Sequence, residues 1–349
     1  DLPRGMKVRQ NPSLLNLNTF GLDGTAGLLY EIECEEDLLA LPAFDSSRDF
    51  ILGGGSNVVL VSDIPGAVYL NRISGIDVVA EDEAQVMVEA GAGENWHQLV
   101  RWSVDRGLAG LENLSLIPGS AGAAPVQNIG AYGVELASLI ERVTAWDLQR
   151  QQWIVFQRED CRFAYRDSLF KSGDPDRYLI TSIRLALNKA FEPVLHYAGL
   201  KEELDHRNVS SLTPRVVSDA VCALRQRKLP DPEQEGNAGS FFKNPVVSRP
   251  VAEKLLARYE NLPAWPQPGG DVRLSAAWMI DYCGLKGARV GGAAVSTRHA
   301  LVLVNTGDAS GSDVAALAKQ VQLSVEQSFD VVLEPEPRLV DFKADCRDF

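Results

Sequence analysis

The sequence predicts an α+β chain, and three observations lead to this fold class. Residues 14–188 contain many short segments in which apolar and polar residues alternate, as in half-buried strands. From Tyr197 onward the apolar residues recur at helical spacing instead. Hydrophobic residues make up 45% of the 349 residues, which is enough for a substantial core and for two or three domains. A strand-rich part followed by a helix-rich part is typical of α+β proteins.

The composition restricts the class of partner. A formal net charge of −13 disfavours nucleic acid and anionic membrane surfaces. No apolar run reaches the ~18 residues of a membrane span, and no signal-peptide pattern is present. Five widely spaced cysteines form no CxxC pair, so we expect neither a disulfide framework nor a bound metal. This cysteine usage fits a cytoplasmic protein, which is the location we expect. We also expect a monomer.

The first part of the chain reads as strands joined by glycine-rich turns. Strands are expected at 14–20, 28–34, 49–52, 58–61, 68–70, 77–80, 85–89, 143–148, 153–157 and 178–187. A short helix is expected at 36–41, and a longer one at about 95–106 that Gly107 closes as a C-terminal cap.

The second part reads mainly as helices. Thr213 followed by Pro214 is a helix start, and this helix runs to Arg227. Other helices are expected at 200–205, 251–259, 275–283 and 312–328, with strands at 300–305 and 331–340. The proline- and charge-rich run 228–236 is a linker candidate.

Two stretches of small residues are the first candidates for a ligand site. GGGSN, residues 53–57, lies between two strands, and a hairpin turn or a diphosphate cradle would both explain it. We prefer the cradle, because a turn does not need three glycines followed by Ser and Asn. No GxGxxG before a helix and no GxxxxGK[ST] is present, so a Rossmann dinucleotide site or a P-loop is not supported.

The second stretch, IPGSAGAAPVQNIGAYG, covers residues 117–133 and contains no charged residue. Glycines and prolines exclude a regular helix there, and the stretch is too apolar for a solvated loop. Its backbone must therefore approach either another backbone or a phosphate-bearing ligand closely.

Three further segments combine reactive groups with small or aromatic neighbours. Arg166, in YRDS, would form either a surface salt bridge or a fixed cation for a carboxylate. Ser240, in GNAGSFFKNP, does not fit the GxSxG nucleophile motif, and it is either a turn residue or a proton donor. LEPEPR, residues 333–338, is either a solvated edge strand or an extended segment whose two acids point the same way.

The order and spacing of these motifs resemble the UDP-N-acetylenolpyruvoylglucosamine reductase family over roughly residues 14–339. The motifs that carry the resemblance are GGGSN, IPGSAGAAPVQNIGAYG, CRFAYRDSLFK, GNAGSFFKNP and LEPEPR. The segment PVLHYAGL, residues 193–200, resembles the tyrosine loop of the family's first type.

The resemblance implies an FAD-binding fold of the vanillyl-alcohol oxidase type with a C-terminal α/β substrate domain. It implies FAD subdomains at 6–75 (with 331–342) and 76–226, and a substrate domain at 227–330. It also implies that NADPH reduces FAD, and that the enolpyruvyl group of the sugar nucleotide then receives a hydride and a proton to give UDP-N-acetylmuramate for peptidoglycan. The implied FAD contacts are Gly53, Gly54, Gly55, Ser56, Asn57, Pro118, Gly119, Ser120, Ala121, Gly122, Asn128 and Gly130.

The implied catalytic residues are Arg166, Ser240 and Glu336, with Ser240 as the proton donor. Glu336 is chosen over Glu334 because the family's acid lies two residues before an arginine, here Arg338. Pro337 stands where the family usually has an aliphatic residue, which raises the question of how the backbone is hydrogen-bonded there. The implied substrate contacts are Tyr197, Lys228, Asn244 and His299.

Other functions remain open at this stage. An FAD oxidase of the same fold would share GGGSN but would not need NADPH, Ser240 or Glu336. A nucleotide-sugar binding protein without chemistry would be colourless when purified. An NAD-dependent dehydrogenase is disfavoured because the chain lacks GxGxxG.

Overall fold

The computed structural model describes residues 5–197 and 199–344, which form two compact units. Among the described residues, unit 1 contains 5–12, 25–55 and 64–227, and unit 2 contains 13–24, 56–63 and 228–344. The chain therefore passes repeatedly from one unit to the other. The division into three domains expected from the sequence stays a prediction.

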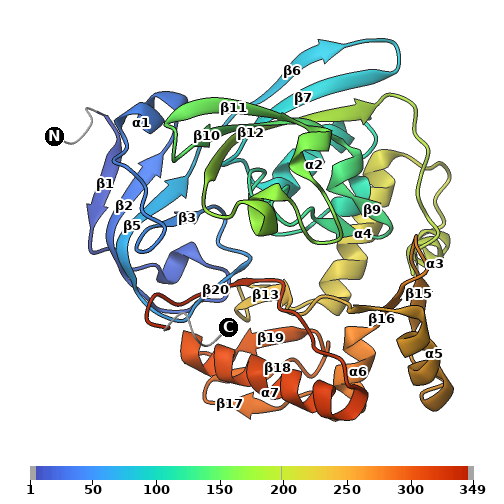
Figure 1. Ribbon diagram of the computed structural model, residues 1–349. Helices are drawn as coiled ribbons and strands as arrows, with labels where there is room; N and C mark the ends of the chain where they lie inside the picture. Colours follow the sequence, from blue (N-terminus) through green and yellow to red (C-terminus); the bar gives the residue numbers. More distant parts are fainter. Residues whose placement is uncertain (1–4, 198, 345–349) are drawn as a thin grey trace. The chain divides into compact units, whose positions relative to one another are not determined.

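Unit 1 contains two sheets and a small hairpin (Figure 1). The first sheet has the order β1 (Lys7–Gln10), β2 (Ala26–Ile32), β5 (Ile64–Asn71), β3 (Phe50–Leu52), with β5 parallel to both of its neighbours. The second has the order β11 (Gln152–Gln157), β10 (Ile140–Asp147), β12 (Tyr178–Asn188), β7 (Gln85–Gly91), β6 (Ile76–Glu81) and is antiparallel throughout. The hairpin pairs β8 (Gly130–Ala131) with β9 (Val134–Glu135).

The helices of unit 1 follow their sequence signals closely. They are α1 (Glu35–Ala40), α2 (Trp96–Asp105), α3 (Leu200–His206) and α4 (Pro214–Lys228, whose last residue belongs to unit 2). Asn95 caps α2 by accepting the N–H of Gln98, and Gly107 beyond its end has φ +70°. Thr213 caps α4 through the N–H of Val216, as predicted.

Apolar clusters of described residues stabilise the sheets of unit 1. One lies on the five-stranded sheet and buries α2, including Trp96 and Leu99. Another joins Tyr30 and Tyr69 of the first sheet to Trp146 and Leu179 of the second. Helices α3 and α4 form a separate apolar cluster, against which Tyr132 and Leu195 pack. The sequence therefore buries its alternating strands as expected from their period of two.

In its described residues, unit 2 is built from short strands and the α-helices α5 (Arg249–Arg258), α6 (Ala276–Tyr282) and α7 (Gly311–Phe329) (Figure 1). Its main sheet has the order β13 (Asn237–Ser240), β19 (Val302–Asn305), β18 (Ala293–Val295), β17 (Arg289–Val290). A second sheet has the order β14 (Val246–Val247), β16 (Val272–Leu274), β15 (Ala264–Pro266), and β4 (Val58–Leu60) pairs in parallel with β20 (Arg338–Val340). Helix α7 contacts β17 and β18.

One expected strand is wrong, and another is shorter than expected. Residues 14–20 do not form a strand; Leu15–Leu17 form a 3₁₀ helix instead. The side chain of Asn18 stabilises this turn, since its amide nitrogen donates to the carbonyls of Leu14 and Leu22 at 2.9 and 3.0 Å. The last strand covers only Arg338–Val340 of the expected 331–340, because Pro335 and Pro337 have no N–H for a ladder.

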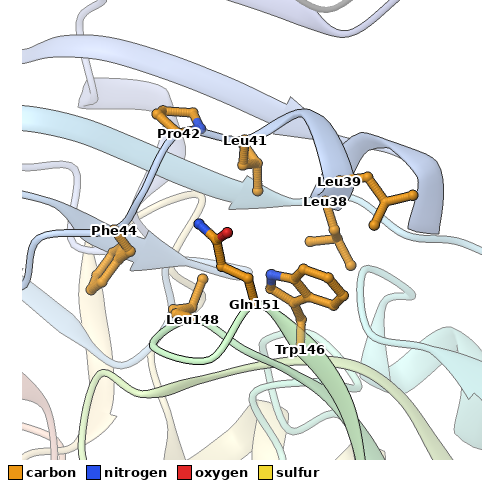
Figure 2. Close-up of a pocket in the computed structure, with 8 residues that line it drawn as sticks. All are labelled: Leu38, Leu39, Leu41, Pro42, Phe44, Trp146, Leu148 and Gln151. Atoms are coloured by element: carbon orange, nitrogen blue, oxygen red, sulfur yellow. The ribbon is translucent and has the colours of Figure 1, made fainter.

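A pocket of about 130 Å³ opens in unit 1 between the segment around α1 and the end of β10 (Figure 2). Its lining is apolar apart from Gln151 and carries no ionisable side chain; the residues are Leu38, Leu39, Leu41, Pro42, Phe44, Trp146, Leu148 and Gln151. None of them was expected from the sequence to take part in chemistry.

Within the described part of the chain, no helix combines the length and apolar character that crossing a membrane requires. The four described cysteines, 34, 161, 222 and 283, carry free thiols.

Candidate active site

The glycine turn GGGSN is not a hairpin. Strand β3 before it pairs with β5 in unit 1, and strand β4 after it pairs with β20 in unit 2. Gly53, Gly54 and Gly55 belong to unit 1, whereas Ser56 and Asn57 belong to unit 2. Gly55 has φ +66°, a left-handed conformation that favours glycine. The hairpin alternative for this motif is therefore wrong.

In unit 1 the two stretches of small residues lie against each other. A Cβ atom on Gly54 would lie 2.8 Å from Gly119 Cα, and one on Gly53 would lie 2.7 Å from Ser120 Oγ. Side chains at these glycines would therefore force the two backbones apart. The glycines therefore allow two backbone segments to approach each other closely. That a ligand also binds to these segments stays a prediction.

The second stretch is held in place by backbone hydrogen bonds. Trp96 N donates to Gly119 O at 2.9 Å, and Ala121 N and Gly122 N donate to Glu94 O and Ala92 O at 2.8 Å. A Cβ atom on Gly122 would lie 2.4 Å from Ala92 Cβ. Pro118 directly precedes Gly119, whose φ is +115°. The loop is thus a fixed surface, and it contains no carboxylate that would repel a diphosphate.

The end of this stretch also positions Arg166. The guanidinium of Arg166 donates to Gly130 O at 2.8 Å and lies 5.1 Å from the ring of Tyr165. The amide of Asn128, which is buried, donates to Ala164 O at 3.0 Å and to Glu135 Oε2 at 2.7 Å. Because the Asn128 side chain is used in this way, any contact of Asn128 with a cofactor would have to come from its backbone.

Arg225 of α4 is a functional candidate that the sequence reasoning missed. Burial lowers the pKa of its guanidinium, and the positive charge of Arg166 lowers it further. Its Nε is shielded from solvent and donates to no acceptor among the described residues. The sequence did contain a signal for its burial, because Arg225 lies four residues after the buried Val221, at the spacing of one helix face in α4. Two neighbouring guanidiniums of this kind favour an anion.

Within unit 2 the structure brings Ser240 and Glu336 into adjacent segments. Ser240 ends β13, where it pairs with Val302. The next residue, Phe241, accepts a hydrogen bond from Glu336 N at 2.8 Å, and Phe242 forms a bridge with Pro335. Phe241 and Phe242 are buried, which fixes this pairing. The two motifs are 96 residues apart in the sequence (336 − 240).

The two acids of LEPEPR lie in different surroundings. The side chain of Glu334 is 70% exposed and forms a salt bridge with Lys243 at 3.0 Å, whereas Glu336 is half-buried. Glu336 N donates to Phe241 O and Arg338 N donates to Asn57 O, at 2.8 and 2.9 Å. The residues on both sides of Pro337 are thus bonded, and the missing N–H of the proline leaves no gap in this pattern.

The four residues expected to contact substrate are distributed over both units. In unit 1, the ring of Tyr197 lies 5.9 Å from that of Tyr132 in an edge-to-face arrangement. The PVLHYAGL loop extends through position 198, which lies outside the described residues. In unit 2, Asn244 Oδ1 accepts the N–H of Ala276 at the start of α6, which leaves the amide nitrogen as the group that could donate to a ligand.

Lys228 and His299 share one neighbourhood in unit 2. Burial lowers the pKa of His299, and the charges of Lys228 and Lys286 lower it further. Leu301 N donates to His299 Nδ1 at 3.2 Å, which places the imidazole proton on Nε2. A neutral Nε2–H beside Lys228 can donate a hydrogen bond to an anionic or carbonyl oxygen.

Comparison with known proteins identifies two domains. Residues 39–149 match the model of an FAD binding domain, and this range includes both stretches of small residues. Residues 231–340 match the model of the UDP-N-acetylenolpyruvoylglucosamine reductase C-terminal domain, which includes Ser240 and Glu336.

Whole-chain relatives agree with these matches. The chain is 46% identical over 335 residues to the UDP-N-acetylenolpyruvoylglucosamine reductase of Dechloromonas aromatica, covering 95% of this chain and 99% of that one. It is 48% identical to that of Bordetella pertussis, covering 95% of each chain. The crystal structure of UDP-N-acetylenolpyruvylglucosamine reductase from Thermus caldophilus matches with a TM-score of 0.67 at 28% identity, covering 96% of this chain and 100% of that one. The predicted α+β fold with an FAD-binding part and a C-terminal domain is confirmed.

Proposed function

The chain belongs to the UDP-N-acetylenolpyruvoylglucosamine reductase family and is an FAD-binding oxidoreductase, and from this premise we propose its reaction and the residues that perform it. The proposed reaction is the NADPH-dependent reduction of the enolpyruvyl group of UDP-N-acetylenolpyruvoylglucosamine. The product is UDP-N-acetylmuramate, a precursor of peptidoglycan. We propose that the enzyme acts as a monomer in the cytoplasm.

The observation that carries the proposal is the pairing of the Ser240 and Glu336 segments in unit 2. The segments that carry Ser240 and Glu336 are distant in sequence, and the hydrogen bond from Glu336 N to Phe241 O joins their backbones. The burial of Phe241 and Phe242 makes this arrangement rigid. Rigid placement of an acid and a proton donor is what proton transfer to a reacting carbon requires.

The residues of the two small-residue stretches fit an FAD. Glycines let the two stretches approach each other closely, and neither stretch has an acid that would repel the diphosphate. We propose that Gly53, Gly54, Gly55, Ser56, Asn57, Pro118, Gly119, Ser120, Ala121, Gly122, Asn128 and Gly130 hold the cofactor. When bound, FAD supplies the redox chemistry by accepting hydride from NADPH and giving it to C3 of the enolpyruvyl group.

Side chains of this protein bind the substrate carboxylate, stabilise the enolic form and supply the proton. Arg166 binds the carboxylate of the enolpyruvyl group, and Glu336 stabilises the enolic form that develops beside it. Ser240 Oγ then donates its proton to C2 and recovers one from solvent. An alcohol is a weak acid, but a carbanion is a much stronger base, so this transfer runs downhill.

The remaining predicted residues act on the nucleotide. Tyr197, Lys228, Asn244 and His299 contribute a phenol, a cation, an amide N–H and an imidazole N–H. These groups, with Arg166 and Arg225, would let a chain of net charge −13 hold a diphosphate and a carboxylate.

A visible spectrum of the purified protein tests the proposed function. Flavin absorption that bleaches with NADPH under anaerobic conditions and returns with UDP-N-acetylenolpyruvoylglucosamine would support both halves of the reaction. Absorption that returns only with oxygen would instead indicate an oxidase. A protein that shows no flavin absorption even after FAD is added would overturn the proposal.

Gly130→Ala tests the role of the loop that positions Arg166. A Cβ atom there would lie 2.7 Å from Arg166 Nη1 and 3.1 Å from Val134 O, so the guanidinium must move. We expect kcat/KM for the UDP-sugar to fall about tenfold, which corresponds to about 1.4 kcal/mol. The measurement is steady-state kinetics of NADPH oxidation.

Gly24→Ala is the matched control for this variant. Its added Cβ would be 3.5 Å from Leu60 Cδ1, an ordinary contact, and we expect kcat/KM to change less than about twofold. Equal losses in the two variants would indicate a general effect of the added methyl group and contradict the role of Arg166.

A further inference from the structure

We propose that Asn113 is a positioning residue for substrate binding. Its buried amide holds two segments together: the segment that contains Tyr197, and the segment that contains Tyr132. This inference rests on the proposed function, in which Tyr197 contacts the UDP-sugar. Asn113 lies in a 3₁₀ turn, Glu112–Leu114, at the entrance to the second stretch of small residues. It is one of the residues that sequence reasoning did not select.

A single amide nitrogen makes both connections. Asn113 Nδ2 donates to Tyr132 O and to Val194 O, each at 2.9 Å. The side chain is 1% exposed, so water does not compete for these bonds. Asn113 therefore joins two segments that are 62 residues apart (194 − 132) and that meet at no strand pairing. Both acceptors are carbonyls, so the nitrogen must face them.

Contacts of Tyr132 and Gly133 with the segment 194–197 then fix the position of Tyr197. The ring of Tyr132 meets the ring of Tyr197 edge to face, with centroids 5.9 Å apart and planes at 74°. Gly133 has φ +81°, and a Cβ atom on it would lie 3.2 Å from His196 Nε2. The segment 194–197 thus follows the backbone of Tyr132 and Gly133 closely. Tyr197 itself is 47% exposed, which leaves its phenol accessible to a ligand.

The N–H donor of Asn113 is essential for positioning Tyr197, and a variant of the same size can remove this donor. In Asn113→Asp an oxygen replaces the nitrogen and faces the carbonyls of Tyr132 and Val194, so attraction becomes repulsion. Asn113→Ala removes the side chain and leaves both carbonyls unbonded. In either case the segment 194–197 is released from Tyr132. We expect KM for the UDP-sugar to rise about tenfold, with kcat changed less than about twofold.

A double-mutant cycle tests whether Asn113 acts through Tyr197. Asn113→Asp, Tyr197→Ala and the double variant are compared by steady-state kinetics and by titrating the flavin absorption with UDP-N-acetylglucosamine. If the inference is right, Asn113→Asp weakens binding about tenfold in the wild-type background and less than about twofold in the Tyr197→Ala background. Losses that simply multiply in the double variant would overturn it.

A second buried asparagine of unit 1 provides the matched control. Asn71 is 8% exposed and donates to Ile180 O at 2.7 Å, far in sequence from Tyr197. We expect Asn71→Ala to lower the melting temperature without changing KM. A melting temperature that falls for Asn113→Asp while KM stays at the wild-type value would contradict the positioning role.

Gly133→Ala keeps the inference testable if the Asn113 variants do not accumulate. An added Cβ strains the backbone at φ +81° and would lie 3.2 Å from His196 Nε2 and 3.5 Å from Val194 Cγ1, so we expect the contact with this segment to be disturbed and KM to rise. An unchanged KM in this variant would count against the inference. Failure of the proposed function itself is recognised separately, because the wild-type flavin would then not be reoxidised by the enolpyruvyl substrate.

Discussion

Ser240→Ala is expected to lower kcat about 10²–10⁴-fold while flavin reduction by NADPH keeps its wild-type rate. The variant loses only the hydroxyl proton that C2 of the substrate requires. Ser240 lies at the end of β13, beside a register irregularity at which Gly239 has φ +70°. Alanine suits this extended position, so the fold should be retained. Anaerobic stopped-flow spectroscopy separates the two halves of the reaction by following flavin bleaching and then its recovery.

Ser310→Ala is the control for this prediction. Ser310 caps α7 in the same unit by accepting the N–H of Asp313 at 3.0 Å. Its loss costs about 1 kcal/mol of stability but touches no proposed catalytic group. We expect normal recovery of flavin absorption in this variant. If Ser240→Ala also recovered at the wild-type rate, the proton would have to come from another group.

Glu336→Gln is expected to lower kcat about 10²–10³-fold, which is the usual effect of removing one electrostatic stabiliser of a transition state. The substitution keeps the shape of the side chain and leaves the backbone bonds of Glu336 N and Arg338 N in place. The effect should appear in recovery of the flavin absorption and not in its bleaching. Steady-state and stopped-flow measurements at saturating substrate provide the comparison.

Glu334→Gln is a control of the same chemistry two residues away. Glu334 is exposed, and its salt bridge with Lys243 lies at the surface, so its loss should cost about 1 kcal/mol or less. We expect turnover within about twofold of wild type. A large loss for Glu334→Gln together with normal activity for Glu336→Gln would reverse our choice between the two acids.

The elements that the sequence predicted well are those with local signals. Asn95, Thr213 and Ser310 cap their helices through hydrogen bonds that span only a few residues. The failures at 14–20 and 331–337 have the same origin. There, the Asn18 side chain and the two prolines override the alternation of apolar residues.

The arrangement of the site could not be derived from local signals. The motifs around Ser240 and Glu336 were recognised by resemblance, but their pairing depends on contacts between distant segments. The roles of Asn113 and Arg225 also depend on such contacts. Asn113 bonds to Val194, and Arg225 comes within electrostatic range of Arg166, only after the chain has folded. Spacing along the sequence carries no signal for contacts of this kind.

The repeated passage of the chain between the two units affects how the protein emerges from the ribosome. Strand β4 ends at residue 60, but its partner β20 begins at residue 338. At about 5–20 residues per second, the paired strand is synthesised roughly 15–55 s later. During this interval the β4 segment lacks its strand partner, while residues 64–227 of unit 1 are being made. The nascent chain must therefore keep an early, apolar strand from pairing elsewhere until translation is almost finished.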